Sequence, residues 1–126
     1  MPLCVVSHGF GATLAIDVFT QLQQLHESGE DDRDCSPLER GLTLAYMGTI
    51  GCPQPLATAC SSQQSLGHRL TVPNPFIQER WPHLRGGWSN FYHKDDPISF
   101  PMQHATQSAV EDVECQGRWH GEEEIQ

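Results

Sequence analysis

Residues 3–15 read Leu-Cys-Val-Val-Ser-His-Gly-Phe-Gly-Ala-Thr-Leu-Ala, and this stretch decides the fold class. The apolar run Leu3–Val6 is typical of a strand buried on both faces of a parallel sheet. It stops at the glycine-rich segment 7–11. Apolar residues then recur every three or four positions, which predicts a helix of about three to four turns from Ala12 to Ser28. The stretch therefore predicts a strand, a tight turn and a helix, in that order.

Three further strands are expected at Leu42–Met47, Trp88–Tyr92 and Val110–Cys115. A short helix is expected to start at 36–39, where a serine, a proline and a glutamate have the spacing of the N-cap, N1 and N3 positions. The glycines and proline that follow Met47 are expected to end the second strand there. Residues 53–87 show no sustained period and are expected to form a long irregular excursion. The predicted fold class is α/β, with a parallel sheet of about four strands and flanking helices.

The length of 126 residues predicts one domain, 1–126. The net charge of −9 and the lack of a basic stripe exclude nucleic acid as a partner. The apolar runs span only a few residues, so no membrane span is expected. The five cysteines form no CxxC pair and the seven histidines no HExxH motif, which predicts reduced thiols, a cytoplasmic location, no metal and no cofactor.

Three known chemistries use a strand, a glycine-rich turn and a helix. A dinucleotide fingerprint needs a third glycine where this chain has Leu14. A Walker P-loop needs a Gly-Lys-Ser/Thr sequence, and the only lysine of the chain is Lys94. The third chemistry is that of the nucleophile elbow.

Residues 5–15 resemble the elbow segment of lipases and esterases of the α/β-hydrolase fold, whose pattern is G-H-S-L-G followed by small and apolar helix residues. His8 matches the position before the nucleophile, Gly9 the nucleophile itself and Gly11 the last glycine. Residues 49–53 are similar to the Gly-Ser-Pro turn after the family's next strand. The resemblance continues through residues 88–98, which match the strand and turn that deliver the family's acid.

The resemblance implies site residues in the order nucleophile, acid and histidine. Asp96 is the implied acid and His120 the implied base, and the Phe10 amide is the implied oxyanion donor. Ser7 is a weaker alternative for the nucleophile, and Asp95 for the acid. Gly9 has no hydroxyl, and loss of a serine nucleophile typically lowers turnover by about a million-fold.

The leading hypothesis is a protein related to serine esterases and lipases that is weak or inactive because its nucleophile position is Gly9, with a small ester or acyl ligand. The family's strands before the elbow are missing, so the domain is expected to be truncated and the Leu3–Val6 strand to lie at an open sheet edge. The alternatives are a non-catalytic module that pairs through this edge, as a homo-oligomer or with a partner chain, and a partial product of a longer hydrolase gene.

Overall fold

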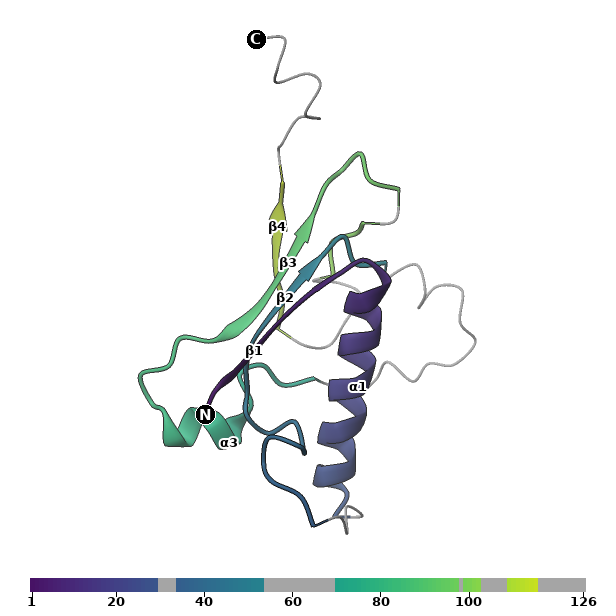
Figure 1. Cartoon of the computed structure of the whole chain (residues 1–126). Coiled ribbons are helices and arrows are strands. Elements are labelled where there is room, and N and C mark those ends of the chain that lie inside the picture. Colours follow the sequence, from purple (N-terminus) through teal and green to yellow (C-terminus); the bar gives the residue numbers. More distant parts are fainter. Residues whose placement is uncertain (30–33, 54–69, 98, 103–108, 116–126) are drawn as a thin grey trace.

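The computed structural model describes residues 1–29, 34–53, 70–97, 99–102 and 109–115, and every structural statement below concerns these residues. Four strands and two helices occur in them (Figure 1). In chain order they are β1 (Leu3–His8), α1 (Phe10–Glu27), β2 (Leu44–Ile50), α3 (Pro75–Arg80), β3 (Gly87–Tyr92) and β4 (Glu111–Glu114).

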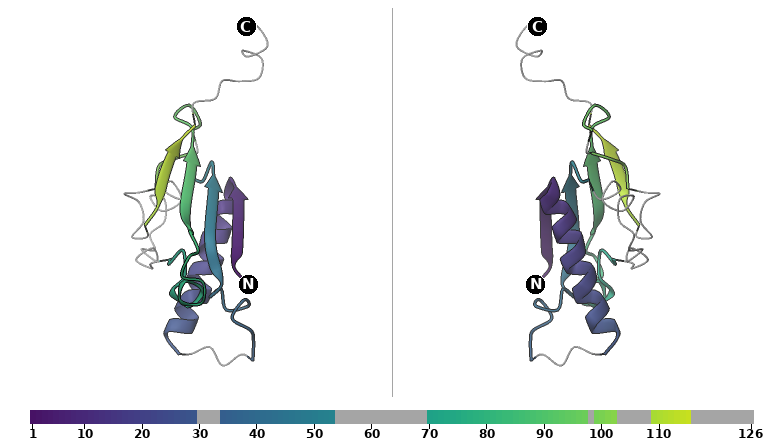
Figure 2. Two further views of the ribbon diagram at one scale, coloured as in Figure 1. Left: turned by 90° about the vertical axis from the view of Figure 1, so that its left-hand side faces the viewer. Right: turned by 90° about the vertical axis from the view of Figure 1, so that its right-hand side faces the viewer.

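The four strands form one parallel sheet in the order β1-β2-β3-β4. Figure 2 shows them side by side, with β1 in purple at one edge and β4 in yellow at the other. Val5 lies opposite Met47, which in turn lies opposite Trp88. The prediction of a small α/β fold with about four parallel strands is confirmed.

Helix α1 packs against one face of the sheet and encloses the core with it (Figure 1). Its inward residues include Ala12 and Ile16, which are buried because they recur at helical spacing. They pack against strand side chains on the face of the sheet that α1 covers, to which every second residue of a strand points. The buried core cluster consists of Ala12, Ile16, Leu44, Met47, Cys52, Leu70, Trp88, Met102 and Val110.

The prediction that the first strand is buried on both faces is wrong. Its residues alternate between half-buried and exposed positions, and the side chain of Val6 is 64% exposed. Leu3, Val5 and Ser7 are the half-buried set, and Cys4, Val6 and His8 are the exposed set. Strand β1 thus buries one face, because α1 covers only one side of the sheet there.

Strand β2 does not end at Met47 as predicted but continues through Gly48 and Thr49 to Ile50. Gly48 pairs with neighbours on both sides, and a Cβ atom added to it would lie 3.3 Å from the ring of Tyr46. The tyrosine ring thus lies over the space that a side chain would take. A glycine in a strand can mark such a close approach, so it does not by itself end the strand.

Two expectations about the connections are also wrong. Residues 37–43 form turns and not a helix, although Ser36 and Glu39 make the hydrogen bonds of a capping box. Gly41, with φ +72°, turns the chain toward β2 after that single turn. The segment 53–87 is not irregular throughout, because α3 begins at Pro75, with Asn74 as N-cap accepting a hydrogen bond from the amide of residue 76.

Candidate functional site

The carboxyl ends of the strands meet at one edge of the sheet. The amide of Gly9 donates to the carbonyl of Ile50 at 2.8 Å, and that of Gly51 to the carbonyl of Phe91 at 2.9 Å. The first residues after β1 and β2 therefore continue the hydrogen-bond ladder and lie next to each other. In open parallel sheets, this edge is where ligands bind.

Gly9 forms the sharp turn between β1 and α1. Its backbone has φ 61° and ψ −133°, a conformation that residues other than glycine adopt only with strain. A Cβ atom added to Gly9 would meet nothing within 4 Å. Residue 9 therefore forms a sharp strand-to-helix turn, with open space where a side chain would start.

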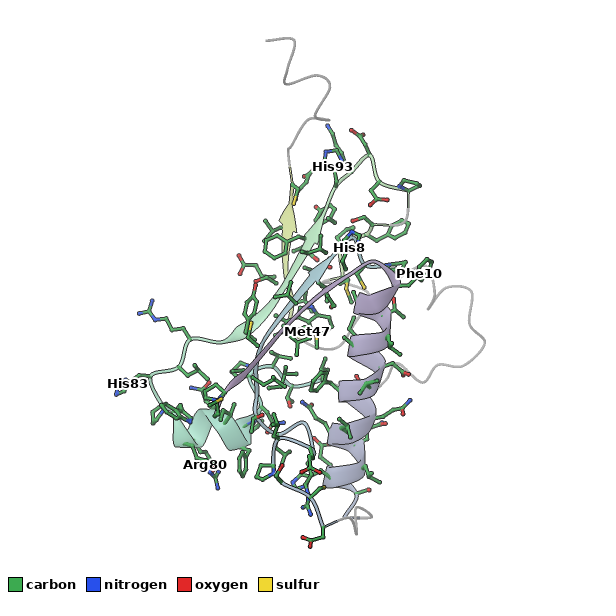
Figure 3. All side chains as sticks on the ribbon, in the orientation of Figure 1. His8, Phe10, Met47, Arg80, His83 and His93 are labelled. Atoms are coloured by element: carbon green, nitrogen blue, oxygen red, sulfur yellow. The ribbon has the colours of Figure 1, made fainter. Side chains whose placement is uncertain are left out.

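Two polar side chains lie near Gly51, the residue that follows β2. A Cβ atom on Gly51 would lie 3.6 Å from Asp96 Oδ2 and 3.8 Å from His8 Nε2. A carboxylate from the turn after β3 and an imidazole from the last residue of β1 therefore both lie near Gly51. Figure 3 shows His8 and Phe10 at this end of the molecule.

The turn after β3 separates the two candidate acids. Its shape is fixed by the amide of Asp96, which donates to the carbonyl of His93 at 3.0 Å. The side chain of Asp95 is 66% exposed, and its Oδ2 lies 3.9 Å from Nδ1 of His93. Asp96 is half-buried and faces Gly51. The geometry therefore brings Asp96 to the Gly9 edge and leaves Asp95 on the outer side of the turn.

The remaining candidates occupy different positions. The half-buried Ser7 donates a long hydrogen bond, 3.5 Å, to the carbonyl of Gly48. Phe10 is the first residue of α1, so its amide is one of those that the helix itself leaves without a carbonyl partner. Its ring is 74% exposed. His120 lies outside the described residues.

A buried polar network holds the strands together beneath this edge. Thr49 Oγ1 donates to Asn90 Oδ1 at 2.8 Å and accepts from Trp88 Nε1 at 3.1 Å. Asn90 Nδ2 donates to Asp112 Oδ1 at 3.0 Å, and this oxygen also accepts the amide of Met102 at 2.7 Å. Hydrogen bonds between side chains thus tie β2, β3 and β4 together, and the backbone amide of Met102 joins the loop after the Asp96 turn to them.

The arrangement can orient an imidazole and polarise a carbonyl, but it has no nucleophile at residue 9. A carboxylate beside an imidazole can hold the ring in one tautomer, and a helix amide can bind a developing oxyanion. His8 was not among the predicted site residues. Its place near Gly51, on the same side as Asp96, depends on the register of β1, β2 and β3, which no local sequence pattern carries.

One cavity of the described structure lies elsewhere. It has a volume of about 660 Å³ and is found at the amino ends of β3 and β4. Its lining includes Tyr46, Arg85 and Glu111 but none of His8, Gly9, Gly51 and Asp96. This cavity is therefore separate from the Gly9 edge.

Comparison with family models, curated proteins and solved structures found no match for this chain. Neither helix of the described ranges has the length and apolar character needed to cross a bilayer. Within those ranges, no three histidine, cysteine or acidic side chains gather in a group that could hold a metal ion.

Proposed function

We propose that the chain is an α/β-hydrolase-like scaffold, related to serine esterases and lipases, in which hydrolysis is weak or absent because Gly9 supplies no attacking oxygen. The observation that carries the proposal is the backbone at Gly9, a strand-to-helix turn with φ 61° and ψ −133° at the carboxyl end of a parallel strand. The convergence of Asp96 and His8 over the neighbouring Gly51 supports it. The ligand of this scaffold is a small ester or acyl group.

The roles follow from chemistry and position. If residue 9 were serine, the Phe10 amide would donate to the oxyanion of the tetrahedral intermediate. Asp96 would hold the tautomer of the histidine base. The base is His120 by resemblance to the family, and His8 is the alternative that the geometry offers.

The test compares the wild type with Gly9→Ser, using a short-chain nitrophenyl ester and a fluorophosphonate probe. We expect no labelling of the wild type and a slight gain for G9S, since the proposal assigns one oxyanion donor among the described residues, the Phe10 amide, whereas this family uses two. Gly11→Ser is the matched control, because a Cβ atom at Gly11 also meets nothing within 4 Å. It adds the same hydroxyl two residues away from the elbow.

Two results would contradict the proposal. Labelling of the folded wild type would mean that another residue acts as the nucleophile. Equal labelling of G9S and G11S would mean that residue 9 has no special position. In the G9S background, His8→Ala and His120→Ala identify the base as the residue whose loss removes the gain, and Asp96→Asn should remove it in either case.

A second function is favoured by a separate observation, the position of β1 at the end of the sheet. In this function the chain is a non-catalytic module that pairs through the free edge of β1. An exposed strand edge presents backbone donors and acceptors to another strand. Co-purification that is lost on Val6→Lys tests this function without reference to catalysis.

A further inference from the structure

The free edge of β1 has a definite hydrogen-bonding pattern. Leu3 and Gly9, at its two ends, donate their amides to carbonyl oxygens on the β2 side, each at 2.8 Å. The N–H and C=O of one strand residue point to the same side, and this side alternates along the strand. The odd-numbered residues therefore pair with β2. Cys4, Val6 and His8 direct their backbone groups away from it.

The ends of this free edge are also defined. Pro2 would be the next residue whose backbone groups point away from β2, but it has no N–H to donate. At the other end, the turn at Gly9 leads into α1. The pairing edge is therefore limited to three residues and is symmetric about Val6.

Of the usual protections of an edge strand, these three residues have only a register shift, which lies between Leu3 and Cys4 in the pairing of β1 with β2. Natural edge strands carry lysines, inward-pointing charges, prolines or bulges that prevent pairing. Cys4, Val6 and His8 are exposed, and none is an acid or a lysine. Although the chain has a net charge of −9, none of these three residues is acidic. Two copies of β1 can therefore meet without an acid opposing an acid.

We propose that a second copy of this chain pairs with the free edge, with the two β1 strands antiparallel and Val6 opposite the partner's Val6. The inference rests on the second function proposed above and names its partner. In this register, Val6 and the partner's Val6 exchange both backbone hydrogen bonds. Cys4 exchanges both with the partner's His8, and His8 does so with the partner's Cys4.

This register uses every backbone group that the free edge offers, which is why a second copy fits it. A shift of two residues along the strand would leave at least one of the three residues of each copy without a partner. The two-fold axis lies perpendicular to the sheet, so both sheets join into one and α1 of each copy stays on the same face. Such a closed isologous contact is the commonest symmetry of soluble oligomers.

The first experiment measures molar mass by size-exclusion chromatography with light scattering, over a range of concentrations and at moderate salt. We expect the wild type to run at twice the 14.1 kDa chain mass. Val6→Lys should run as a monomer, since two lysines would face each other across the seam. Val6→Pro should weaken the dimer without breaking the fold, because the Val6 amide points away from β2 and the sheet does not use it.

Leu14→Lys is the matched control. Leu14 is 63% exposed against 64% for Val6, and it lies on the outer side of α1, opposite the buried Ala12 and Ile16. The change in charge and size is nearly the same, so L14K should remain a dimer. Circular dichroism melts confirm that the three variants are folded.

The second experiment tests the register through oxidation of Val6→Cys. The Cα atoms of a hydrogen-bonded antiparallel pair are about 5.5 Å apart, within the roughly 4.4–6.8 Å that a disulfide spans. The background keeps the buried Cys52 and replaces Cys4, Cys35, Cys60 and Cys115 by serine. V6C should form a disulfide-linked dimer in this background, and Leu14→Cys should not.

The outcomes separate this inference from the function on which it rests. A wild type that stays monomeric at all concentrations overturns pairing with a second copy, and co-purification then tests separately whether the edge binds a different chain. A dimer that V6K abolishes but V6C does not link keeps the pairing edge and overturns the register. A dimer that V6K leaves intact and L14K dissociates overturns both the β1 edge as the interface and the register.

Discussion

The buried hydroxyl of Thr49 is predicted to stabilise the fold, whereas the buried hydroxyl of Thr43 is predicted not to. Thr49 is 0% exposed and makes two hydrogen bonds, as donor to Asn90 Oδ1 and as acceptor from Trp88 Nε1. Thr43 is 5% exposed, and in the described part of the chain its Oγ1 has no hydrogen-bond partner. Replacement of each by valine makes the same change of hydroxyl to methyl.

The expected magnitudes follow from the groups left behind. Thr49→Val removes the hydroxyl that bonds to Asn90 Oδ1 and Trp88 Nε1, and each buried polar group that loses its partner costs about 1–3 kcal/mol. The loss of stability should therefore be about 2–6 kcal/mol, a large part of the roughly 5–15 kcal/mol of a typical domain. Thr43→Val removes a hydroxyl that makes no bond, so it should be neutral or stabilise the fold by up to about 1 kcal/mol.

The assay is urea unfolding followed by tryptophan fluorescence, with Trp88 as an internal reporter of the network. The shift of the midpoint at constant slope gives the change in the free energy of unfolding. T49V should unfold at clearly lower urea than the wild type, and T43V at the same or higher urea. A T49V midpoint equal to that of the wild type, or equal losses for both variants, would refute the reasoning.

The other predictions concern the backbone. Gly86→Ala should lower the free energy of unfolding by about 1–3 kcal/mol or prevent folding, because its Cβ would overlap the backbone carbonyl of Ala45. Gly11→Ala is the control and should stabilise the fold slightly, so equal urea midpoints of the two variants would contradict this prediction. Gly9→Ala should cost about 1–3 kcal/mol through the positive φ alone, since its Cβ meets nothing within 4 Å, and G11A is again the control. Asn74→Ala should cost about 0.5–2 kcal/mol by removing the N-cap of α3, and Asn74→Ser should recover most of this loss in thermal melts.

Local patterns predicted the elements of the sheet because they reflect contacts between near neighbours in the chain. The apolar run before Gly9 and the helical spacing after it predicted β1 and α1, and the aromatic run at 88–92 predicted β3. The same local reasoning was wrong where a distant group changes the outcome. The ring of Tyr46 lies over Gly48 and the strand continues there, although glycine predicted its end.

The sequence by itself determined the order of strand, turn and helix and the glycine at residue 9, since these depend on side-chain size and spacing along the chain. Only the tertiary structure decided that Asp96, and not Asp95, faces Gly51, and that His8 also lies near Gly51. It also decided that Val6 lies exposed on the outermost strand. The physical reason is that the register and order of parallel strands set these neighbours, through hydrogen bonds between segments tens of residues apart.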